Sequence, residues 1–87
     1  MNWEICYSHR AKKFIQKHKI EDEIRNTIKK FILRYEGEDI NIDVKKLKGK
    51  WKGYDRIRIG ETRIILKVEQ EFNRIIIDTI DFREGIY

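Results

Sequence analysis

Two different periods organise the hydrophobic residues of this chain. At the start, Trp3, Ile5 and Tyr7 alternate with polar or small residues, which predicts a short β-strand. From Ser8 to Lys19 the apolar residues recur at helical spacing instead. We therefore expect an amphipathic helix over Ser8–Lys19, with the hydroxyl of Ser8 as its N-cap.

A second helix is predicted by a stronger apolar stripe. Its apolar residues follow one another at spacings of four, three, one and three: Ile24, Ile28, Phe31, Ile32 and Tyr35. Acidic residues fill its first turn and basic residues its end, which complements the helix dipole. Gly37 stands where a C-cap is expected. The connection between the two helices is very short, so we expect an antiparallel pair.

After an acidic link, Glu36–Asp43, the hydrophobic period becomes that of strands. The expected strands are a short one anchored by Leu47, then Tyr54–Ile59, Thr62–Val68 and Ile75–Phe82. The last is rich in β-branched residues, which favours a position inside the sheet. The order β-α-α-β-β-β-β predicts one α+β domain over residues 1–87, with a largely antiparallel sheet and the helical pair on one face.

The loop Gly60-Glu61 fixes the register of the central hairpin. A two-residue loop with glycine first suits a tight type II′ turn. With that loop, Arg58 faces Arg63 across the ladder. The strand period of two then sorts the side chains: Arg56, Arg58 and Arg63 share the outer face, whereas Ile57, Ile64 and Leu66 face the core.

The predicted pair of Arg58 and Arg63 has a cost. Like charges directly opposed on a sheet destabilise it by a few tenths to about 1 kcal/mol. An anion bound between the two guanidiniums would convert this repulsion into attraction, and arginine is well suited to phosphate oxygens. The alternative is a solvated charged face on which the two side chains splay apart.

Positive charge is concentrated around this hairpin. Residues 45–63 carry eight basic and two acidic side chains, a net charge of +6, whereas the whole chain carries +5. Local positive charge of this kind attracts a polyanion. We expect Lys48, Lys50 and Lys52 to bind the phosphates of a nucleic acid, and Trp51 and Tyr54 to stack on its bases. Partial burial is the alternative for both aromatic residues.

Other classes of protein fit the sequence less well. Cys6 is the single cysteine, so no internal disulfide forms and a reducing compartment is expected. No signal peptide and no long apolar run is recognised, which indicates a cytoplasmic protein without membrane contact. His9 and His18 fall on opposite sides of one helix and cannot share a site. No cluster has metal-ligand spacing, and we expect neither a metal nor another cofactor.

Three short motifs together resemble the RelE/ParE superfamily of toxins from toxin–antitoxin systems. They are Leu47-Lys48-Gly49, then Tyr54-x-Arg56-Ile57-Arg58-Ile59-Gly60-x-x-Arg63-Ile64, and a closing Arg83-x-x-Ile86-Tyr87. The resemblance covers essentially the whole chain, and the hairpin motif is its most specific part. It implies a cognate antitoxin as partner. RelE-like members cut mRNA on the ribosome without a metal, whereas ParE-like members inhibit DNA gyrase.

The RelE-like branch is the preferred interpretation, and it assigns roles to residues. Arg58 and Arg63 would clamp the phosphate, because the high pKa of arginine makes it a poor base. Arg83 would stabilise the transition state or act indirectly as an acid. Tyr87 would be the base or an orienting group, unless it is a terminal aromatic that covers the sheet edge. Arg56, together with Lys52, would hold the substrate backbone.

Two positions depart from the family pattern near its end. Phe82 stands where many members have histidine, and Asp81 stands where some ribonucleases of the family carry another cation. These departures keep open a third hypothesis, a basic module that binds RNA without cleaving it, beside the ribonuclease and the gyrase inhibitor.

Overall fold

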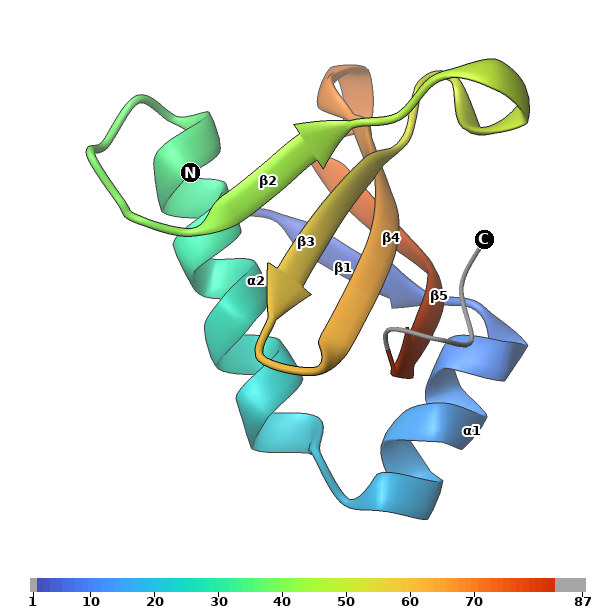
Figure 1. Ribbon diagram of the computed structural model, residues 1–87. Coiled ribbons are helices and arrows are strands. Elements are labelled where there is room, and N and C mark those ends of the chain that lie inside the picture. The colour runs from blue at the N-terminus through green and yellow to red at the C-terminus, as the bar shows by residue number, and fades with distance from the viewer. Residues whose placement is uncertain (1, 83–87) are drawn as a thin grey trace.

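The computed structural model describes residues 2–82 of the 87-residue chain (Figure 1). The elements are, in order, β1 (Glu4–Tyr7), α1 (His9–His18), α2 (Glu21–Tyr35), β2 (Asp43–Lys46), the 3-10 turn η1 (Gly49–Trp51), β3 (Asp55–Ile59), β4 (Thr62–Glu69), the 3-10 turn η2 (Gln70–Phe72) and β5 (Arg74–Phe82). The predicted order of helices and strands is confirmed. Arg83 and Tyr87, which were expected in the site, lie outside the described residues.

The strands form one mixed sheet in the order β1-β5-β4-β3-β2. β1 pairs with β5 in parallel, and the other neighbours are antiparallel. The expected α+β class with a largely antiparallel sheet is therefore confirmed, and β5 lies inside the sheet as predicted. Both helices cover one face, where the buried side chains form the core: Ala11, Ile15, Ile24, Ile28, Phe31, Ile57, Ile64, Leu66, Ile75, Ile77 and Ile80.

Local sequence signals explain where the helices begin and end. The hydroxyl of Ser8 accepts a hydrogen bond from the backbone N–H of Ala11 at 3.1 Å, so the predicted N-cap of α1 is confirmed. At the end of α2, Gly37 has a φ of +105°. The N–H of Glu38 donates to the carbonyl of Leu33, the pattern of a Schellman motif that needs a left-handed residue at this glycine.

The two helices diverge in an open V from their short connection, as Figure 1 shows. They do not lie flat against each other because each helix turns its apolar stripe toward the sheet. Ala11 and Ile15 of α1, with Ile24 and Ile28 of α2, reach the same core from two directions. One consequence is that α1 packs against β5.

The position of the first hairpin strand was predicted wrongly. The sequence predicts it around Leu47, whereas β2 spans Asp43–Lys46 and includes the last residue of the expected acidic link, Asp43. The physical reason is tertiary: Val44 pairs with Ile57 of β3 and packs against the core. Leu47 still adds one backbone hydrogen bond, from its N–H to the carbonyl of Tyr54 at 3.0 Å, just beyond the strand.

The central hairpin has the predicted register. Arg58 pairs with Arg63 and Ile57 with Ile64. Gly60 has a φ of +53°, and Glu61 is not among the described residues with positive φ, as a type II′ turn requires. Between β4 and β5 the register shifts at Ile65 by one residue.

No helix among residues 2–82 is long and apolar enough to cross a membrane.

Candidate nucleic-acid interface

One row of charged residues crosses the outer face of the sheet, the face away from the helices. Strand pairing aligns Asp43 of β2, Arg58 of β3, Arg63 of β4 and Asp81 of β5. The opposed arginines predicted from sequence are therefore present. The tertiary structure adds an acid on each outer side of the pair, which reduces the repulsion that the hairpin alone would suffer.

A second row lies next to the first, and its two central residues, Arg56 and Ile65, are buried. It aligns Lys45, Arg56, Ile65 and Thr79. Arg56 is only 8% exposed and its Nη2 donates to Oδ1 of Asp43 at 2.8 Å, a diagonal contact between the two rows. Its Nε is buried and makes no hydrogen bond to any described residue. Arg56 thus lies under the outer surface, where it holds the carboxylate of Asp43.

This diagonal ion pair changes the surroundings of Arg58. Asp43 is directly opposite Arg58 in the ladder, but its carboxylate is engaged by Arg56. Within residues 2–82 the guanidinium of Arg58 makes no hydrogen bond or ion pair. Arg58 also lines an open groove of about 410 Å³ between α2 and β2, whose other charged residues are Glu23, Lys30 and Asp43. Because its guanidinium has no partner among residues 2–82, its donors can bind an anion on the outer face.

The basic segment before β3 forms the opposite end of the same region. Lys48, Lys50 and Lys52 are exposed in and around η1. Trp51 and Tyr54 are half-buried and contact each other edge to face, with ring centroids 5.3 Å apart. The expected lysines and aromatic residues are thus brought together, and the two rings are partly buried by each other.

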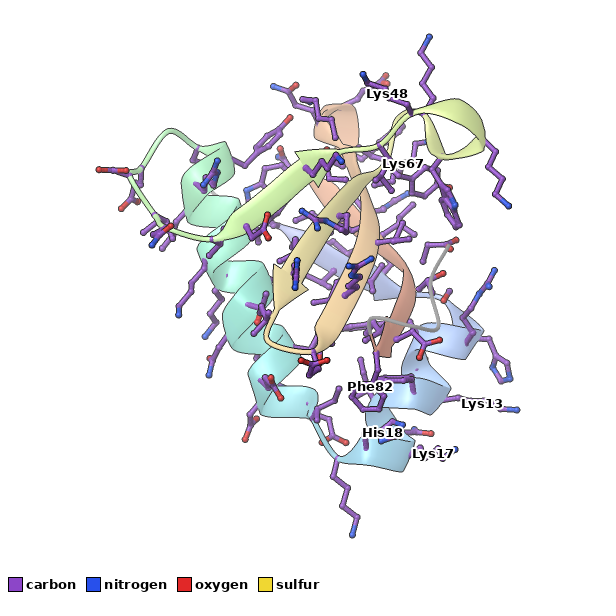
Figure 2. All side chains as sticks on the ribbon, viewed as in Figure 1. Lys13, Lys17, His18, Lys48, Lys67 and Phe82 are labelled. Carbon is purple, nitrogen blue, oxygen red and sulfur yellow. The ribbon has the colours of Figure 1, made fainter. Side chains whose placement is uncertain are left out.

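A groove runs along this end of the sheet. It has a volume of about 370 Å³ and is lined by Lys45, Lys46, Leu47, Lys48 and Trp51. Figure 2 shows Lys48 at this end with Lys67, whose Nζ lies 6.0 Å from the ring centroid of Tyr54. Three basic side chains around one apolar floor suit an anionic chain with flat groups attached to it.

The sequence did not assign Asp43 or Lys67 to this surface, and it indicated Asp81 only as a departure from the family pattern. Lys67 had a usable signal, because the strand period places it on the same face as Arg63. No local signal in the sequence pairs the two acids with the arginines, since that pairing depends on which strands become neighbours.

Among residues 2–82, no three side chains of histidine, cysteine, aspartate or glutamate gather in a way that would hold a metal ion.

The titratable groups with shifted pKa values lie elsewhere. Burial raises the pKa of Asp55, and the nearby Lys46 lowers it by a smaller amount. Burial likewise raises the pKa of Tyr7, against a smaller opposing effect of Arg25. Asp55 pairs with Leu66, whose side chain belongs to the core, so its carboxyl group lies on the helix side of the sheet. It is not part of the charged rows.

The structure is similar to several toxins of known structure. In a YoeB–YefM complex from Staphylococcus aureus, the matching chain is 26% identical, with 94% of this chain and 98% of that chain covered and a TM-score of 0.71. In the RelB–RelE antitoxin–toxin complex from Methanococcus jannaschii, the match is 28% identical and covers 94% of each chain, with a TM-score of 0.58.

A mutant toxin from Helicobacter pylori, bound to copper, has the same fold. It is 16% identical, with 99% of this chain and 100% of that chain covered and a TM-score of 0.77. No family model matches the chain. No curated protein matches it significantly. The similarity therefore rests on three-dimensional structure over nearly the whole length of each compared chain.

Proposed function

We propose that this chain is the toxin of a toxin–antitoxin pair and cleaves mRNA on the ribosome, which its structural similarity to YoeB- and RelE-type proteins at 26–28% identity supports. The observation that carries the proposal is the pair Arg58 and Arg63 on the outer face of the sheet. The guanidinium of Arg58 makes no ion pair within residues 2–82, so it can accept a phosphate without first losing a partner.

The proposed reaction needs no metal. The 2′-hydroxyl of the RNA loses its proton to a base, and its oxygen attacks the adjacent phosphorus. The bond from phosphorus to the 5′-oxygen breaks, and an acid transfers a proton to that oxygen. The products are a 2′,3′-cyclic phosphate and a 5′-hydroxyl. Negative charge grows on the phosphoryl oxygens during the attack, and Arg58 with Arg63 would stabilise it. The two proton transfers need other groups, because arginine stays protonated.

The remaining roles follow the proximity of residues to this pair. Arg56 would act as a positioning residue, since it is buried and holds Asp43 away from Arg58. The exposed lysines 48, 50 and 52 would bind the RNA backbone on either side of the cleavage point. Arg83 and Tyr87, which the family resemblance assigns to the chemistry, are proposed as transition-state stabiliser and proton carrier.

We also propose a cognate antitoxin as the partner that keeps the toxin inactive. Two of the similar structures are toxin–antitoxin complexes, which supports this. β1 and β2 are the edge strands of the sheet, and an edge strand can pair with an extended segment of another chain. Action on ribosomes places the proposed function in the cytoplasm.

The test is translation-coupled cleavage in a reconstituted system, mapped by primer extension. We expect Arg58→Ala and Arg63→Ala each to slow cleavage about 100- to 1,000-fold, the loss typical when one donor to a developing oxyanion is removed. Lys29→Ala removes one exposed cation from α2, outside the charged rows, and serves as the matched control. It should cleave like the wild type.

Two outcomes would contradict the proposal at different levels. If both arginine variants cleave mRNA at the wild-type rate, the assignment of the site is wrong although the protein is a ribonuclease. If the wild type makes no ribosome-dependent cuts but inhibits supercoiling by gyrase, the chain acts as the gyrase-inhibiting branch of the superfamily does. If it does neither and still binds RNA, the third hypothesis, binding without cleavage, replaces the ribonuclease.

A further inference from the structure

Helix α1 is a second concentration of positive charge, separate from the hairpin. It and its C-cap carry five cations, all exposed, and no acid: Arg10, Lys12, Lys13, Lys17 and Lys19. Their combined charge of +5 is as large as the net charge of the whole chain, so the rest of the chain is neutral on balance. The amphipathic pattern of α1 explains why these residues face solvent, but it does not explain why every charged residue has the same sign.

An exposed aromatic cluster lies directly beside this helix. Phe82, the last described residue of β5, is 44% exposed. Its ring contacts Phe14 at 5.2 Å and His18 at 4.9 Å between centroids, and the latter two rings are 4.3 Å apart. Two rings from α1 therefore fix the orientation of Phe82 while much of its surface stays open to solvent.

The helix period brings cations next to this cluster. Phe14 and His18 are four residues apart and form one ridge of α1, and Lys13 with Lys17 forms the adjacent ridge. Figure 2 shows Phe82 and His18 together where β5 meets α1, with Lys13 and Lys17 extending outward from the same helix. Exposed aromatic surface and unopposed positive charge thus occupy one small area.

This area adjoins the end of the charged row. Phe82 follows Asp81, which pairs with Arg63, and Phe82 itself pairs with Thr62 beside the hairpin loop. Successive residues of a strand point to opposite faces. A strand of RNA bound at Arg63 on the outer face would therefore meet Phe82 if it passed over the end of the sheet.

We propose that Phe82, supported by Phe14 and His18, stacks on a base of single-stranded RNA while Lys13 and Lys17 bind its phosphates. The proposal rests on the proposed function and names a second contact area for the same RNA. An exposed ring can stack on any base, and nearby cations attract the backbone that carries it. Lys13 and Lys17 form no ion pair within residues 2–82, whereas Arg10 of the same helix lies 4.0 Å from Asp78, so these two lysines are the cations proposed to bind phosphates.

Stacking is tested with a labelled 12-nucleotide oligouridine and an abasic oligonucleotide of equal length, by fluorescence anisotropy. We expect Phe82→Ala to weaken binding of the oligouridine about 5- to 100-fold, the usual effect of losing one stacked base. Phe82→Trp should bind at least as tightly as the wild type. Neither variant should change the affinity for the abasic chain. Equal losses on both ligands, or no loss on oligouridine, would overturn the stacking.

The phosphate contacts are tested by the salt dependence of the same binding. Lys13→Ala with Lys17→Ala should reduce the slope of log K against log salt by about 1.4, because each contact to a single strand contributes about 0.7. Arg25→Ala with Lys29→Ala removes two exposed cations at the same spacing on α2 and should leave the slope unchanged. Equal slopes in the two double variants would refute the role of α1.

These outcomes are separable from failure of the proposed function. If the ribosome assay shows cleavage while Phe82→Ala binds oligouridine normally, the inference falls and the ribonuclease stands. If cleavage is absent but stacking and slope behave as expected, the surface binds RNA without the reaction. If Phe82→Ala leaves RNA binding intact but weakens binding to the cognate antitoxin, the cluster is a protein-docking site and the inference is wrong.

Discussion

The ion pair between Arg56 and Asp43 makes a sharp prediction, because it links the stability of the sheet to the site. Nη2 of Arg56 lies 2.8 Å from Oδ1 of Asp43. The side chain of Arg56 is 9% exposed and that of Asp43 is 54% exposed. Asp43→Asn keeps the shape of the side chain, removes its charge, and leaves the arginine buried without a compensating carboxylate.

The magnitude follows from opposing contributions. Two unit charges 2.8 Å apart attract by about 6 kcal/mol at an effective dielectric constant of ~20. Desolvation of the guanidinium cancels much of this gain, and the half-exposed carboxylate is partly screened by water. A charge-assisted hydrogen bond of this kind is worth about 2 kcal/mol net. We therefore expect Asp43→Asn to lower the free energy of unfolding by about 2 kcal/mol.

The assay is a double-mutant cycle with urea unfolding, using Asp43→Asn, Arg56→Met and the double variant. The double variant should be more stable than the sum of the single changes predicts, with a coupling energy of about 1.5–2 kcal/mol. In thermal unfolding, Asp43→Asn should lower Tm by roughly 8–16 °C, given the size of the domain. Asp39→Asn removes one exposed acid from the preceding loop and should change neither quantity by much.

RNA affinity should move in the opposite direction from stability. Asp43→Asn removes a negative charge beside Arg58, so binding of oligouridine should become tighter at low salt. A coupling energy below about 0.5 kcal/mol would refute the structural role given to Arg56. An ordinary ion pair exposed to solvent already contributes that much to stability. Weaker RNA binding by a folded Asp43→Asn protein would refute the assignment of this face to an anion.

Two further predictions concern the framework of the site. Ser8→Ala should destabilise the protein by about 1–2 kcal/mol in urea unfolding, since Ser8 caps α1 and its hydroxyl also donates to the carbonyl of Asp78; a change below about 0.5 kcal/mol would contradict this. Asp55→Asn should raise Tm at pH 7 but not at pH 3. The folded protein raises the pKa of Asp55, so the charged carboxylate opposes folding at pH values above the ordinary pKa of aspartate. Equal changes in Tm at both pH values would show that this charge is not responsible.

The sequence by itself determined the parts of the fold that depend on short-range periodicity. The apolar stripe of α2, the cap at Ser8 and the loop at Gly60 act within a few residues, so pattern and turn chemistry sufficed to predict them. The same locality placed Arg58 opposite Arg63. Two strands joined by a two-residue loop leave no choice of partner or register.

The tertiary structure decided everything that depends on which distant segments become neighbours. The parallel pairing of β1 with β5, the position of β2, and the acids Asp43 and Asp81 beside the arginines follow from strand order, which no local period encodes. The meeting of Phe82 with His18 joins the end of the last strand to the end of the first helix. Such contacts form only when the whole core closes, because the cost of closing long loops is met by burial shared among all the elements.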